Sequence, residues 1–87
     1  MDMSLFRANL ENDRIRRHIN LLWKLAAGTA DEETKAIGWE QTLTDAYYHL
    51  DCLMIEIPVI RAAKNRKNFT KIWREYKAEL AELEAIH

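Results

Sequence analysis

Apolar residues recur every three or four positions along most of this sequence, and this spacing constrains the fold more than any other feature. One run consists of Leu5, Ala8, Asn12, Ile15, Ile19, Leu22 and Ala26, with Asn12 as its polar member. A second consists of Trp39, Leu43, Ala46, Leu50, Leu53, Ile57 and Ile60. Residues at these intervals share one face of an α-helix. The chain has only two Gly and one Pro, too few turn residues for a small sheet protein. We therefore predict an all-α fold.

The turn signals divide the 87 residues into three amphipathic helices of a single domain, residues 1–87. The first helix is expected over about 4–27, because Asp2 or Ser4 can cap its start and Gly28 can end it. The second is expected from about 31, after a turn that includes Thr29 and Asp31, and the third over about 69–85. We expect these helices to form an antiparallel helical bundle, coiled-coil-like in its packing.

Pro58 leaves the end of the second helix open to two interpretations. It can kink a helix that runs over about 31–64, with a polar turn at 65–68. It can instead be the first residue of the third helix, and the 3-4 spacing from Val59 to Leu83 runs without interruption. We prefer the kinked helix, since a turn at 55–57 would contain no Gly, Asn or Asp.

The first two helices each carry a second apolar stripe, roughly opposite the first. A helix on the outside of a monomer needs only one such stripe. The central helix of a monomer, covered on both sides, would also have two. Three helices offer too little surface to cover every stripe, so we expect the remainder to pack against a second copy of the chain as a homodimer. The residues expected at this interface are Phe6, Leu10, Leu21, Leu25, Tyr48, Cys52, Ile55 and Val59.

The segment 61–77 holds seven cationic residues and one carboxylate, Glu75. Its aromatic residues Phe69, Trp73 and Tyr76 fall on the apolar side of a helix, about 180° from the cations. They are therefore expected in the core, where they cannot stack on bases. A face that contacts nucleic-acid phosphates or an acidic partner remains the alternative function. The cations of this face are Lys64, Lys67, Lys71 and Arg74.

Catalytic and metal-binding patterns are weak in this sequence. His49, Cys52 and Glu56 share a helical face, but no second Cys/His pair would complete a zinc site. Cys52 lies in apolar surroundings, which favour an inert thiol. We expect no catalytic residue, no metal site and no cofactor.

Composition restricts the remaining classes. The net charge is −1, which gives no general attraction to anionic polymers or membranes. A single Cys and a start without a basic-apolar leader pattern favour a cytoplasmic protein. No apolar run approaches the roughly 20 residues needed to cross a bilayer. The sequence is therefore most typical of a small, non-enzymatic protein–protein interaction module, an adaptor, regulator or inhibitor that binds itself and a further protein.

Overall fold

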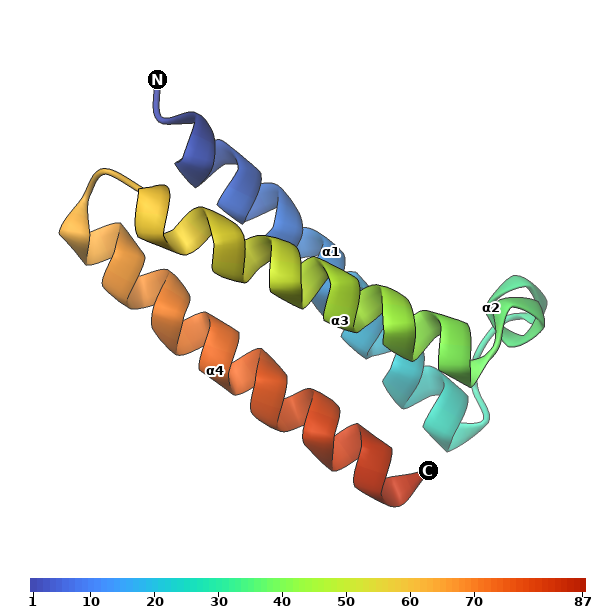
Figure 1. Cartoon of the computed structure of the whole chain (residues 1–87). Coiled ribbons are helices and arrows are strands. Elements are labelled where there is room, and N and C mark those ends of the chain that lie inside the picture. Colours follow the sequence, from blue (N-terminus) through green and yellow to red (C-terminus); the bar gives the residue numbers. More distant parts are fainter.

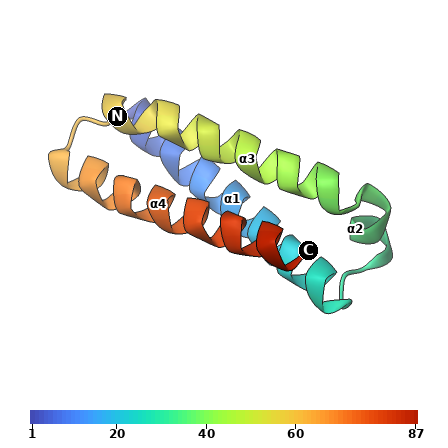
Figure 2. The ribbon, with the colours of Figure 1, turned by 60° about the horizontal axis from the view of Figure 1, so that its bottom comes forward.

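The computed structural model describes residues 1–87 and contains helices but no strand, which confirms the all-α prediction. In chain order the elements are α1 (Met3–Ala27), α2 (Glu32–Ile37), α3 (Trp39–Glu56), the 3-10 turn η1 (Ile57–Val59) and α4 (Ala63–Ile86). The three long helices lie side by side, α3 antiparallel to α1 and α4 antiparallel to α3 (Figures 1 and 2). The short α2 lies across one end. None of these helices has the length and apolar character that a membrane span requires.

Helix α1 packs most extensively against α3, and both helices bury small residues. Ser4 and Ala8 on α1 are buried, as are Thr42 and Ala46 on α3. Side chains this short let two helix backbones approach closely. Larger apolar side chains fill the rest of the core on these two helices: Ile15, Ile19, Leu22, Leu50 and Leu53. Both predicted core runs therefore face the interior, although Ala26 is exposed.

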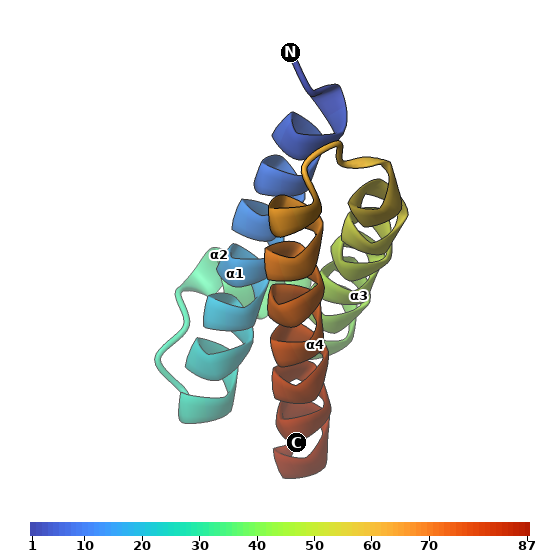
Figure 3. The ribbon, with the colours of Figure 1, turned by 90° about the vertical axis from the view of Figure 1, so that its left-hand side faces the viewer.

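Helix α4 lies against one side of the α1–α3 pair (Figure 3). Phe69, Leu80 and Leu83 are buried there, and Trp73 and Tyr76 pack against the same core. Polar contacts fix its position. The Trp73 Nε1–H donates to the Leu50 carbonyl at 3.0 Å, and the Tyr76 hydroxyl donates to the Asn12 side chain. The three aromatics predicted for the core are therefore core residues.

The ends of α1 follow the expected chemistry. Asp2 is the N-cap, and its Oδ1 accepts hydrogen bonds from the backbone N–H groups of Ser4 and Leu5. Gly28 ends the helix in the left-handed conformation, with φ of 74°. Asp31 caps α2 by accepting from the Thr34 N–H at 2.8 Å. The predicted bounds 4–27 thus agree with α1 to within one residue.

The prediction of one kinked helix over 31–64 is wrong. Gly38 divides it near its start: with φ of 88° it leaves the helical conformation, so α2 ends at Ile37 and α3 begins at Trp39. The helix then ends at Glu56, before Pro58. Pro58 lies inside η1, so it neither kinks a continuous helix nor begins α4.

The turn after η1 is held by side chains from elsewhere in the sequence, which is why it needs no Gly, Asn or Asp. The Asp2 Oδ2 accepts a hydrogen bond from the Arg61 backbone N–H at 2.9 Å. The Arg66 guanidinium donates to the carbonyls of Ile60 and Arg61. With the chain reversed at this point, α4 begins at Ala63. The predicted turn at 65–68 and the predicted start near 69 are therefore wrong, because 65–68 is helical.

Replacing Asp2 by Asn is expected to lower the melting temperature by a few degrees near neutral pH. Asn retains an oxygen to cap α1 but offers an N–H₂ to the Arg61 N–H, so the tie to the turn is lost. The hydrogen bond from Arg61 is the main cause that lowers the pKa of Asp2 from 3.8. The stabilisation that Asp2 provides is therefore complete at pH values above 3.8, its pKa in the unfolded chain. It is lost as the pH falls through the lower pKa that Asp2 has in the folded protein.

Thermal unfolding followed by circular dichroism at several pH values tests this. The difference between wild type and Asp2→Asn should shrink on acidification. Asp51→Asn is the matched control, because Asp51 is exposed and makes no hydrogen bond or ion pair. Equal effects of the two substitutions at all pH values would contradict the assignment.

Candidate functional site

The second apolar stripes of α1 and α3 lie on the same side of the molecule, the side that α4 leaves open. Hydrogen bonds to α4 involve Asn12 and Trp23 on α1 and the backbone of Leu50 on α3. The opposite faces of both helices have a 3-4 spacing of their own. We call this surface the outer face. It consists of Met3, Arg7, Leu10, Arg14, Arg17 and Leu21 on α1 and of Gln41, Asp45, Tyr48, Cys52, Ile55 and Val59 on α3 and η1.

Large apolar side chains of the outer face are exposed to solvent. Ile55 is 66% exposed, Val59 and Tyr48 are each 63% exposed, and Leu10 is 38% exposed. Leu21 and Cys52 are half-buried. Phe6, which is 50% exposed, lies beside this face rather than within it. The alternative of a central second helix covered on both sides therefore does not hold, because α3 is open on its outer side.

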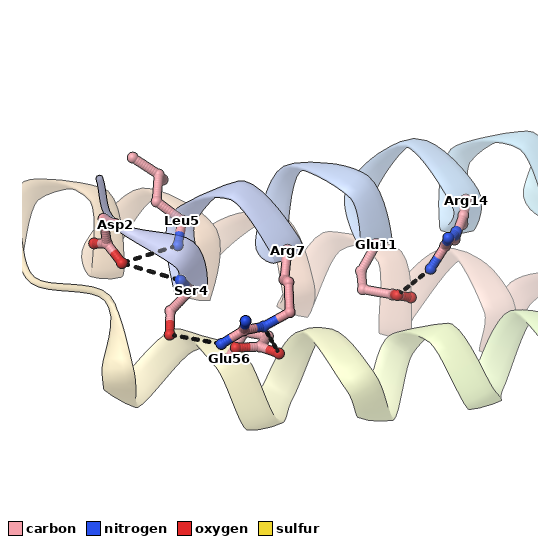
Figure 4. Close-up of polar contacts among 7 residues, drawn as sticks. All are labelled: Asp2, Ser4, Leu5, Arg7, Glu11, Arg14 and Glu56. Carbon is pink, nitrogen blue, oxygen red and sulfur yellow. Dashed lines mark hydrogen bonds and ion pairs between the residues drawn. The ribbon is translucent and has the colours of Figure 1, made fainter.

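Two polar contacts across the seam fix how α1 and α3 are aligned. Arg7 Nε donates to Glu56 Oε2 at 2.8 Å, and His49 pairs with Glu11 at 2.7 Å (Figure 4 shows the Arg7 pair, with α4 behind). In an antiparallel pair these contacts put Met3 level with Val59, Leu10 level with Cys52 and Arg17 level with Asp45. Most apolar residues of the face thus lie toward the end near Met3, although Arg7 lies among them. Its other charged and polar residues lie toward Gln41, which is level with Leu21.

Glu11 is the centre of a polar network beneath the outer face. Its side chain is only 10% exposed, and it accepts from Arg14 at 2.6 Å through one oxygen and from His49 at 2.7 Å through the other. A carboxylate buried this far requires such partners. Figure 4 shows Glu11 and Arg14 one turn apart on α1. This carboxylate therefore joins α1 to α3 as well as bracing Arg14.

The proton positions of the two histidines follow from their partners. His49 Nδ1 contacts the Glu11 carboxylate, and His18 Nδ1 contacts the Arg14 carbonyl. Both partners can only accept a hydrogen bond, so each Nδ1 atom carries a hydrogen and donates it. The two rings lie 5.2 Å apart, centre to centre, at 47°. Tyr48 contacts the His49 ring edge-on, with the ring centres 5.2 Å apart. His49 is thereby fixed in one orientation among polar and aromatic groups.

The three residues weighed as metal ligands have other partners. His49 faces Glu11, and Glu56 binds Arg7. The Cys52 thiol lies next to the Tyr48 hydroxyl and raises the pKa of Tyr48. No group of three or more His, Cys, Asp or Glu side chains in the structure has the geometry to hold a metal ion. His49, Cys52 and Glu56 therefore make contacts within and between helices, beside the exposed apolar residues of the outer face.

Sequence reasoning missed Glu11 and the pair of Arg7 with Glu56. Glu11 lies between Ala8 and Ile15 on the core side of α1. This position in the 3-4 spacing is the sequence feature that could have predicted a buried carboxylate. Its partner is 38 positions away, so nothing local indicates which residue it binds. Leu25, predicted for the interface, is half-buried near the end of α1.

The predicted basic face lies on α4, on the side opposite its core residues. Lys64, Lys67, Lys71 and Arg74 are all exposed, and none forms an ion pair. The structure thus places this face apart from the outer face, on a different helix.

Comparison of the chain with protein-family models, with curated proteins and with solved structures finds no match.

Replacing Glu11 by Gln is expected to lower the free energy of unfolding by about 1–3 kcal/mol. The amide can accept from Arg14 or from His49, but its N–H₂ then faces the other donor. Asp13→Asn is the matched control. The Asp13–Arg16 pair has the same 2.6 Å length and the same spacing, yet the Asp13 side chain is 60% exposed.

For Asp13→Asn the change should stay within about 0.5 kcal/mol, since exposed ion pairs contribute little. Urea unfolding of the two variants measures both values. Similar losses for the two would show that Glu11 has no special part in joining α1 to α3.

Proposed function

We propose that this protein is a non-enzymatic protein–protein interaction module that acts as a homodimer through its outer face. One observation carries the proposal. Exposed apolar residues of α1 and α3 lie next to each other on the outer face, where the alignment of the two helices brings them level. Leaving Ile55, Val59 and Tyr48 in water forgoes the favourable free energy of burial, about 1.5–3 kcal/mol for each large side chain that is fully covered. A surface of this kind is typical of a protein-binding site.

The charges on the outer face favour a second copy as the occupant. The α1 half carries Arg7, Arg14 and Arg17, whereas the α3 half carries Asp45 and is bordered by Glu56. A two-fold interface brings the same surface together twice. If the two-fold axis runs parallel to the helices, α1 of one copy lies over α3 of the other. The arginine-bearing half of one copy then lies over the half of the other copy that carries Asp45.

The other two-fold arrangement is disfavoured. With the axis across the helices, α1 would lie over the α1 of the partner copy. The three arginines would then face one another, and like charges in contact reduce affinity. In the favoured arrangement, rotation about the axis leaves the height of each residue along the helices unchanged. Residues of α1 and α3 that are level within one copy are therefore also level between copies. Arg17 then opposes Asp45 of the second copy, and Met3 opposes Val59. Neither Arg17 nor Asp45 is in an ion pair within the chain.

Ile55→Asp is expected to weaken dimerisation by at least about tenfold, equivalent to about 1.4 kcal/mol. The side chain is exposed in the single chain, so its replacement should leave helical content and folding unchanged. Met54→Asp is the control, because Met54 is also exposed but lies outside the outer face. Light scattering coupled to size exclusion over a concentration series measures the effect. A wild-type protein that stays monomeric throughout would refute the dimer.

A pair of charge reversals tests the axis. Arg17→Asp alone and Asp45→Arg alone each place like charges together twice in a homodimer, and each should dimerise about tenfold less tightly than wild type. An equimolar mixture of the two variants restores both opposite-charge contacts, but only between different chains. The mixture should therefore form heterodimers at concentrations where each variant alone is monomeric.

Sedimentation equilibrium of the separate and mixed variants measures this. An ion pair confined to one chain would give no recovery on mixing. Recovery in the mixture thus distinguishes contacts between copies from a contact within each copy.

A further inference from the structure

The outer surface of α4 carries the strongest local charge in the protein. The segment 61–77 has seven cationic residues and one carboxylate in a chain of net charge −1, so the remainder is acidic. Every ion pair in the structure lies outside this segment. Lys77 lies over the Trp73 ring at 5.2 Å, and Arg66 binds backbone carbonyls. The cations of the predicted basic face have no such partner.

These free cations form a straight row, which we call the basic stripe: Lys64, Lys67, Lys71 and Arg74. Their spacing puts them on one face of α4, and at about 1.5 Å per residue the row is about 15 Å long. A depression of about 550 Å³ lies along it, lined by Lys67, Asn68, Thr70, Lys71 and Arg74. No hydrophobic residue contributes to this lining.

The stripe does not help α4 to fold. The N-terminal end of a helix carries a partial positive charge, so cations there are unfavourable. The first turn of α4 contains no acidic residue, and its N-cap, Ala62, offers no side-chain hydrogen bond. An anion placed along the stripe would neutralise both the side chains and the helix end.

We propose that the basic stripe binds the phosphate backbone of a nucleic-acid duplex without sequence preference. The four cations of the stripe can neutralise at most about four phosphates of a duplex, which carries one negative charge per roughly 1.7 Å of its axis. The stripe has no aromatic member, because Phe69, Trp73 and Tyr76 face the core. Binding of single strands relies on stacking against aromatic side chains. A duplex, which exposes its phosphates and conceals its bases, is therefore the better fit.

Two other anionic partners fit less well. A peripheral membrane helix inserts apolar side chains beside its cations, and the lining of this depression provides none. An acidic protein segment would bring carboxylates but no regular row to match the four cations. These partners serve as the comparison arms of the experiment.

Fluorescence anisotropy with a labelled duplex of about 20 base pairs and mixed sequence tests the proposal. We expect a dissociation constant of about 10⁻⁴–10⁻⁶ M, weakening between about 50 and 200 mM salt with a log–log slope of about −3 to −4. Lys67→Glu/Lys71→Glu should weaken binding at least about tenfold and make the slope shallower by about 2. The control Lys24→Glu/Lys35→Glu changes the net charge equally, away from the stripe, and should change affinity by no more than about threefold.

The comparison arms decide the partner class. Single-stranded DNA, poly-glutamate and vesicles containing phosphatidylserine should each bind more weakly than the duplex. Absence of duplex binding at low salt, equal losses in the two double variants, or tighter binding to any comparison partner would each overturn the proposal. None of these outcomes depends on dimerisation, because both double variants leave the outer face intact.

Discussion

The close approach of α1 to α3 is the constraint on which the other features of this structure depend. Ser4 and Ala8 on α1 and Thr42 and Ala46 on α3 are buried, and side chains this short let the two backbones approach closely. Once the two helices are this close, each has two sides left. One side packs against α4. The other is the outer face, which holds the Glu11 network and the exposed apolar residues. The packing of α1 against α3 thus determines both the position of α4 and the composition of the outer face.

The helical periods and caps could be predicted because their causes are local. Gly28 and Asp2 act within one turn of themselves, and the spacing of Ile15, Ile19 and Leu22 predicts a buried face from α1 alone. The course of the chain around Pro58 could not be predicted, because side-chain contacts rather than turn-forming residue types determine it. The turn is held by Asp2, 59 positions from Arg61. It is also held by Arg66, which is near in sequence but is not a residue type that local turn preference selects. Local turn preference therefore favoured a kinked helix, and tertiary contacts formed a turn.

The candidate site divides in the same way. The exposed apolar stripe on α3 was visible as a 3-4 pattern opposite the core, because helical geometry alone gives the angle between two faces. The alignment of that stripe with Leu10 and Leu21 was not visible. It depends on which residues meet across the seam, and this is set by Glu11 with His49 and by Arg7 with Glu56. The 3-4 spacing of a sequence indicates which residues share a face of one helix. The alignment of two helices depends on the contacts between them.

The two proposed surfaces restrict each other. In a dimer whose axis runs parallel to the helices, the outer faces meet and each α4 lies on the far side from the contact. Both basic stripes would then point away from the dimer in opposite directions. Because rotation about such an axis preserves helix direction, the stripes would also run parallel. One straight duplex could not contact both of them, so a dimer bound through its stripes would bridge two duplex segments. The same geometry keeps the cations of one copy far from those of the other, which removes their repulsion as an obstacle to dimerisation.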